Sequence, residues 1–107
     1  MAVLQEATKL VERWCEERDT RELRDRGRLE STVTGNRITI FECTRIPDEN
    51  WVRVPSAQLR YDPRTQVWTL HWIDGDSKWH IVQVMPTFNI KELLAEVEVD
   101  PYCLFFG

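Results

Sequence analysis

From Leu29 onward the hydrophobic pattern has a period of two, and this alternation constrains the fold more than any other feature. Successive side chains of a strand point to opposite faces of a sheet, so this period predicts strands with one apolar face. The Gly35-Asn36 pair tolerates the positive φ angles of a two-residue hairpin turn. Residues 29–43 are therefore predicted to form a hairpin. The predicted pairs across it are Val33 with Ile38 and Ser31 with Ile40.

A second hairpin is predicted over residues 70–81, where His-Trp and Trp-His flank an acidic turn that contains glycine. With Gly75-Asp76 at the centre of the turn, residues whose numbers have the same sum face each other. Because side chains alternate, the tryptophans and the histidines then lie on opposite faces of the sheet. The predicted pairs are Trp72 with Trp79 and His71 with His80.

The strand that precedes this hairpin is predicted to join it through a turn centred on Arg64-Thr65. This register pairs Tyr61 with Trp68, Leu59 with Leu70 and Ala57 with Trp72. Trp68, Trp72 and Trp79 are thus expected to share one apolar face, which would be the core. The opposite face is predicted to be polar, with Val82 as an exception, and to carry Gln58, Arg60, Thr69, His71, Lys78 and His80.

Between the two hairpins, residues 44–55 contain two prolines and clustered acids around Trp51. Proline cannot donate a hydrogen bond to a neighbouring strand and is rare in central strands. This segment is predicted to be a loop that positions one aromatic side chain.

A helix is predicted at the N-terminus, where apolar residues recur at helical spacing between charged ones. The charged segment 16–28 that follows is predicted to be a solvated helix end and loop, with one further turn capped by Thr20. The apolar residues of the helix are Val3, Leu4, Ala7, Leu10, Val11, Trp14 and Cys15.

A second, short helix is predicted to begin after Asn89, its N-cap, and to run to about Val97. Glu92 occupies the third helical position, and Phe88 is placed to pack against Leu93 as a hydrophobic staple. The tail at residues 100–107 comes next and is rich in apolar side chains, so it is expected to dock on its own sheet or on a second molecule. Its own sheet is favoured, because a proline turns the chain back toward it.

Length and composition narrow the class of protein. Residues 1–107 fit a single α+β domain with an N-terminal helix, an antiparallel meander of about five strands, a short C-terminal helix and an apolar tail. The 14 Lys and Arg against 18 Asp and Glu give a net charge of −4, so no overall positive field attracts nucleic acid or anionic lipid. No apolar run approaches the roughly 20 residues that span a bilayer. The 3 cysteines are widely spaced, which argues against a disulfide framework or a zinc knuckle and favours a cytoplasmic protein.

The chain combines a Trp-x-Leu-x-Trp strand, an Asp-containing turn that leads to Lys-Trp-His, a Leu-rich helix and a tail ending in Phe-Phe-Gly. This combination resembles a bacterial family, the domain of unknown function numbered three thousand and twenty-four. The resemblance extends from about Leu29 to the C-terminus and departs at Tyr102-Cys103-Leu104, where the family has Tyr-Gly-Cys. It implies the fold but no activity. The matching residues are Trp68, Leu70, Trp72, Asp76, Lys78, Trp79, His80, Leu93, Leu94, Phe105, Phe106 and Gly107.

One enzymatic pattern occurs in the sequence. Pro47-Asp48 followed by Asp76-Ser77-Lys78 matches the bare form of a PD-(D/E)xK nuclease motif, in which two carboxylates hold a divalent metal ion and the lysine assists the attacking water. The pattern is permissive, and Asp76 and Lys78 fall in and just after a predicted exposed turn. Turn formation is the simpler interpretation of these residues, and the nuclease is kept as an alternative.

The predicted pair of His71 and His80 suggests a second kind of site. Facing positions bring Cβ atoms to roughly 5 Å, close enough for two imidazoles to share a zinc, nickel or copper ion. Two ligands do not make a site, and Gln58, the nearest polar neighbour, is a poor third ligand. A histidine pair without metal is the simpler interpretation, and no cofactor is expected.

A three-stranded meander with basic residues nearby is also typical of sheet-type nucleic-acid-binding domains. The local charge argues against this function, because residues 53–80 carry three acids beside their four basic residues, too little net charge to neutralise several phosphates. The basic residues are Arg53, Arg60, Arg64 and Lys78.

The sequence therefore predicts a small cytoplasmic bacterial domain that is a non-catalytic binding or accessory module rather than an enzyme. A protein partner or self-association is favoured over nucleic acid, and no membrane association is expected. The predicted contact surface is the apolar tail or the polar sheet face, which carries Gln58, Arg60, His71 and His80.

Overall fold

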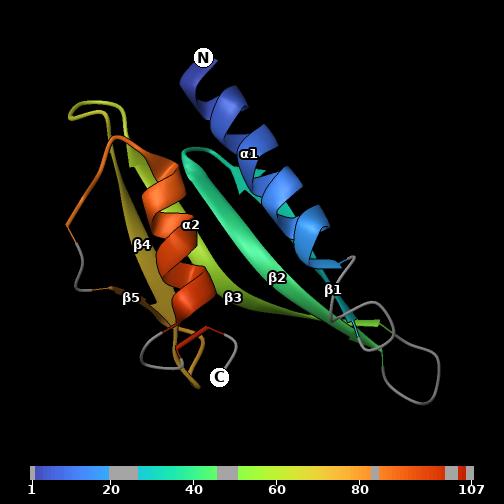
Figure 1. Cartoon of the computed structure of the whole chain (residues 1–107). Helices are drawn as coiled ribbons and strands as arrows, with labels where there is room; N and C mark the ends of the chain where they lie inside the picture. The colour runs from blue at the N-terminus through green and yellow to red at the C-terminus, as the bar shows by residue number, and fades with distance from the viewer. Residues whose placement is uncertain (1, 20–26, 46–50, 83–84, 101–103, 106–107) are drawn as a thin grey trace.

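The computed structural model describes residues 2–19, 27–45, 51–82, 85–100 and 104–105 and shows an α+β fold (Figure 1). One five-stranded antiparallel sheet has the strand order β1-β2-β3-β4-β5, so each strand pairs with its neighbours in the chain. The predicted helix, five-stranded meander and short second helix are confirmed. The elements are α1 (Ala2–Asp19), β1 (Gly27–Thr34), β2 (Arg37–Arg45), β3 (Trp51–Asp62), β4 (Val67–Ile73), β5 (Trp79–Ile81) and α2 (Ile90–Val99).

Both helices lie on the same face of the sheet, α1 along β1 and α2 over β4 (Figure 1). The predicted apolar stripe of α1 faces the sheet, and its residues Ala7, Val11 and Cys15 are buried in the core. Val3, which the spacing places on this stripe, is largely exposed, because the first turn of α1 extends past the end of the sheet (Figure 1). No helix among the described residues is long and apolar enough to cross a membrane.

The core lies between the two helices and the sheet. Trp68 is 1% exposed and is the largest fully buried side chain. The cross-strand pairs predicted for β1 with β2 and for β3 with β4 are confirmed. The strand residues of the core are Leu29, Ile38, Ile40, Ala57, Leu59, Trp68 and Leu70, and α2 adds Ile90, Leu93, Leu94 and Val97.

The segment predicted to be a loop is partly strand, because β2 runs to Arg45 and β3 begins at Trp51, where the two strands pair. The register shifts at Pro55, where Phe41 faces Pro55 but Ile40 faces Ala57, so Ser56 is the extra residue of a β-bulge. A bulge tolerates the missing N–H of proline, and β4 pairs with β3 only from Ala57 onward. The prediction was wrong for residues 44–45 and 51–55, which are strand, and residues 46–50 lie outside the described residues.

The turn between β4 and β5 differs from the predicted two-residue turn. Asp74 accepts backbone N–H groups from Asp76 at 2.8 Å and Lys78 at 3.0 Å, and its own N–H donates to the Lys78 carbonyl. These bonds close a five-residue loop between Ile73 and Trp79, which face each other. The register therefore moves by one residue, and the predicted pairs Trp72 with Trp79 and His71 with His80 are wrong.

A register change of one residue moves every side chain of a strand to the other face of the sheet. Trp79 and Ile81 thus lie on the face opposite the helices, and only Trp68 and Trp72 share the core face. Val82, predicted to be an exception on the polar face, instead packs against the core, and its N–H donates to the Leu70 carbonyl.

The start of α2 confirms the cap at Asn89, whose side chain accepts the Lys91 N–H. Thr87 pairs with Trp68 of β4 through two backbone hydrogen bonds, and its hydroxyl donates to Glu92 at 2.6 Å. Phe88, the next residue, is 76% exposed and does not pack on α2. The predicted staple of Phe88 on Leu93 is therefore wrong.

The described part of the C-terminal tail docks on its own chain. Asp100 ends α2 with φ 45, and its carboxylate accepts the N–H groups of Leu104 at 2.7 Å and Phe105 at 3.2 Å. Phe105 lies in the core with 9% exposure, and Leu104 packs against it. Pro101, Tyr102, Cys103, Phe106 and Gly107 lie outside the described residues.

Deleting residues 104–107 should lower the free energy of unfolding of the monomer by several kcal/mol, because each large apolar side chain contributes about 1.5–3 kcal/mol when buried. Urea unfolding combined with analytical ultracentrifugation measures this. As a control, Phe88→Ala removes an exposed ring and should change stability by no more than about 0.5 kcal/mol. A deletion that leaves the unfolding free energy unchanged would contradict the docking of the tail.

Candidate functional site

The face of the sheet opposite the helices carries no helix of the described chain (Figure 1). We call it the uncovered face. Although the whole chain has a net charge of −4, arginines outnumber carboxylates among the described side chains that register and alternation place here. This face is therefore locally basic. The arginines are Arg28, Arg37, Arg53 and Arg60, and the carboxylates are Glu30 and Asp62.

A group of polar side chains from β2, β3 and β4 occupies the middle of this face, and we call it the polar cluster. One row runs across the strands with Arg60 between Arg37 and Thr69. The neighbouring row has Gln58 at its centre, between a threonine and a histidine. The members of the polar cluster are Arg37, Thr39, Gln58, Arg60, Thr69 and His71.

Hydrogen bonds within the polar cluster fix the side chain of Gln58. Its amide Nε2 donates to Oγ1 of Thr39 at 3.0 Å, and its Oε1 accepts Nε–H of Arg60 at 2.7 Å. Gln58 is only 6% exposed even though no described helix covers it. The Arg60 guanidinium is thus held through one nitrogen, and its two terminal nitrogens have no other partner among the described residues.

His71 lies beside Gln58 and is 8% exposed. Its Nε2 is 2.9 Å from Oγ1 of Thr69. Burial, and then the positive charges of Arg60 and Arg37, lower the pKa of His71 from 6.5 to about 4. His71 is therefore neutral at pH 7, as burial and neighbouring cations require.

Arg37 and Arg60 face each other directly across β2 and β3. Burial and the charge of Arg37 lower the pKa of Arg60 from its ordinary value. Arginine keeps its proton under all ordinary conditions, so the two guanidinium groups repel each other. Neither arginine has an ion pair with a carboxylate of the described residues.

The other end of the uncovered face has paired charges. Glu30 forms ion pairs with Arg28 at 3.0 Å and Arg53 at 3.2 Å, and the Arg53 guanidinium lies 4.3 Å from the centre of the Phe41 ring. Burial and then Glu30 raise the pKa of the nearby Cys43 thiol. A protonated, buried thiol is a poor nucleophile, so this end offers neither an unpaired charge nor a reactive cysteine among its described residues.

His80, predicted to face His71, lies on the helix face instead. Its ring stacks on Trp72 with centroids 4.7 Å apart, and its Nε2 is 2.6 Å from Oδ2 of Asp74. The bond to His80, followed by the backbone N–H groups of the turn, lowers the pKa of Asp74. Within the described ranges no group of three or more His, Cys, Asp or Glu side chains is placed to hold a metal ion. The structure thus separates the two histidines that the sequence placed together.

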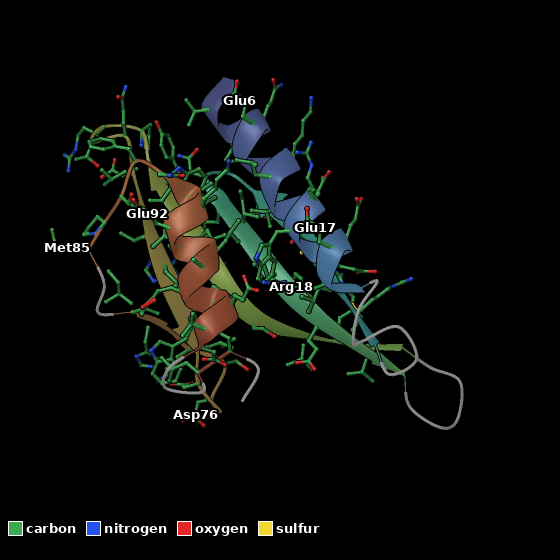
Figure 2. All side chains as sticks on the ribbon, viewed as in Figure 1. Glu6, Glu17, Arg18, Asp76, Met85 and Glu92 are labelled. Atoms are coloured by element: carbon green, nitrogen blue, oxygen red, sulfur yellow. The ribbon has the colours of Figure 1, made fainter. Side chains whose placement is uncertain are left out.

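The residues of the nuclease alternative lie apart from the polar cluster. Asp76 is at the tip of the turn between β4 and β5, at the lower end of the sheet (Figure 2), and both it and Lys78 are exposed. The backbone N–H groups of both residues bond Asp74, as expected for residues that form a turn. Asp48 lies outside the described residues.

A groove of about 300 Å³ separates α1 and α2 on the helix side. Its floor is apolar and its rim has two basic and two acidic residues. Arg18 bridges the helices beside it, with its guanidinium 4.2 Å from the Trp14 ring and an ion pair to Glu98 (Figure 2). The lining residues are Leu10, Arg13, Trp14, Glu17, Lys91, Leu94, Ala95 and Glu98.

The family model for "Domain of unknown function (DUF3024)" matches residues 2–107. The chain belongs to this family. The match includes α1, which the resemblance that began near Leu29 did not cover, so the helix that covers β1 is part of the DUF3024 domain. No curated protein and no solved structure matches the chain significantly.

Sequence reasoning identified four members of the polar cluster and missed Arg37 and Thr39. The signal for both was present, because the predicted hairpin turned Ile38 and Ile40 toward the core and so turned Arg37 and Thr39 away from it. What the sequence lacked was the pairing of β2 with β3, which brings Arg37 next to Arg60.

The low pKa of His71 predicts how stability depends on pH. In the unfolded chain His71 binds a proton below about 6.5, whereas in the folded chain it does so only below about 4, so stability falls as the pH drops between these values. The loss is at most about 3 kcal/mol. Gln at this position does not titrate and can keep a bond to Thr69.

We therefore expect wild type to lose at least about 1 kcal/mol more unfolding free energy than His71→Gln between pH 7 and 4.5, as measured by urea unfolding. An equal loss in both proteins would show that His71 is not held neutral.

Proposed function

We propose that this chain is a non-catalytic binding module whose contact surface is the uncovered face around the polar cluster. The observation that carries the proposal is that the polar side chains there are held in fixed positions. Gln58 and His71 are nearly fully buried and hydrogen-bonded on a face that no described helix covers. These two buried side chains hold the more exposed Thr39, Arg60 and Thr69 in place. The contact surface is thus preorganised, because little conformational entropy is lost when a ligand binds it.

The chemistry of the described residues supports binding over catalysis. The Cys43 thiol is protonated, and Asp76 and Lys78 belong to an exposed turn. His71 is neutral at pH 7, but its Nε2 is bonded to Thr69 and the ring is almost inaccessible. A general base must reach the proton of a bound substrate, so these groups give the nuclease alternative no support.

The uncovered face is favoured over the tail as the contact surface, because Phe105 already fills a position in the core of its own chain. We further propose that the module works in the bacterial cytosol. The buried thiols of Cys15 and Cys43 are compatible with a reducing compartment.

A second candidate function uses the same surface. Four arginines on one face of a sheet, two of them without a described carboxylate partner, favour a sheet-type nucleic-acid-binding domain. The net charge of −4 means that the chain as a whole does not attract nucleic acid. A basic surface on one face of the sheet can nevertheless bind phosphates locally.

The binding proposal is tested by screening a library of small charged and aromatic fragments with amide NMR spectra. We expect the fragments that bind to shift signals of Thr39, Gln58, Arg60, Thr69 and His71, because preformed sites with convergent polar groups collect weak ligands. Hits that gather in the groove beside Trp14 and Leu94, or hits that show no common location, would contradict the proposal.

A further inference from the structure

We propose that the polar cluster binds a phosphate-type oxyanion between Arg37 and Arg60. This inference rests on the proposed function, since it assigns a ligand chemistry to the uncovered face. It is carried by the position of two arginines on neighbouring strands and by the hydrogen bonds that hold one of them in place.

Arg37 and Arg60 place two like charges at directly opposed positions of neighbouring strands. Directly opposed residues have Cβ atoms about 4.5–5.5 Å apart, and like charges at such positions destabilise a sheet. The described carboxylates of this face are engaged elsewhere, Glu30 with Arg28 and Arg53, and Asp62 with the backbone N–H of Arg64 at 2.9 Å. An anion bound between Arg37 and Arg60 would attract both guanidinium groups and so offset the repulsion between them.

The Arg60 side chain is held in place without a ligand. Gln58 holds Nε of Arg60, which leaves the two terminal nitrogens of the guanidinium for a ligand. Thr39 accepts its bond from Gln58, so its hydroxyl proton remains available as a donor beside Arg37. An arginine that is fixed before binding loses less side-chain entropy when it binds an oxyanion.

The arrangement of hydrogen-bond donors favours phosphate over carboxylate. A planar carboxylate is satisfied by the two parallel donors of one guanidinium. Two guanidinium groups on adjacent strands, with the Thr39 hydroxyl in the neighbouring row, offer donors from several directions, which suits the oxygens of a tetrahedral anion. His71 is buried beside the arginines and is neutral at pH 7, so the positive charge of the site comes from Arg37 and Arg60.

The test is a titration with inorganic phosphate, followed by the Nε–Hε signals of the arginines and by backbone amides, with chloride adjusted to keep the ionic strength constant. We expect a saturable shift at Arg60 and at the amides of Thr39 and Thr69. Arg37→Gln should weaken phosphate binding at least tenfold, because the site then holds one guanidinium. Arg37 is exposed, so this variant should keep the wild-type spectrum elsewhere.

Arg53→Gln is the matched control, because Arg53 lies on the same face but is paired with Glu30. Its affinity for phosphate should stay within twofold of wild type. Shifts that do not saturate, or equal phosphate affinity in Arg37→Gln and wild type, would overturn the site. If fragments still gather on the uncovered face in that case, the binding module stands without the oxyanion; if they do not, both proposals fail.

Two sources of phosphate are separated by a second titration, with an oligothymidylate of about ten nucleotides, long enough to fill one sheet-type single-strand site. Binding at least tenfold tighter than that of inorganic phosphate, lost on raising the salt concentration and weakened by Arg37→Gln, assigns the site to a nucleic-acid backbone. Equal or weaker binding assigns it to free phosphate or a phosphate monoester.

Discussion

Both helices pack against the same face of the sheet, and the rest of the structure depends on this one-sided burial. Val11 of α1 and Val97 of α2 meet the inward side chains of the central strands, such as Leu59, in one core. Because side chains alternate along each strand, burying one set fixes the other set on the opposite face. The position of the polar cluster is thus a consequence of core packing.

The turn at Asp74 shows how much a single side chain can decide. Its carboxylate binds two backbone N–H groups and closes a five-residue loop, where Gly75-Asp76 alone would allow a two-residue one. The resulting register brings His80 onto Trp72 and leaves His71 among arginines. Two histidines that resemble a metal-binding pair in the sequence therefore have different surroundings and different chemistry.

Sequence patterns predicted the features that neighbouring residues determine and failed where the outcome depends on competing contacts. The Gly35-Asn36 turn, the stripe of α1 and the cap at Asn89 are local and were predicted correctly. The start of β3 was missed because a bulge accommodates Pro55, and the staple of Phe88 was wrong because Thr87 pairs with β4. For the candidate site, the alternation in β3 and β4 predicted Gln58, Arg60, Thr69 and His71, but their pairing with Arg37 and Thr39 requires the order of the strands.

One face of the sheet is core, and we propose that the other is open to ligands. Broadening of methyl NMR signals by a neutral, soluble gadolinium chelate tests it most directly, because the chelate reaches only surfaces that are open in solution. We expect strong broadening for the methyl groups of Thr39, Thr69 and Ile81, and little for those of Leu59 and Leu70. Thr39 and Thr69 methyl groups as protected as those of Leu59 would contradict it, since the uncovered face would then be buried.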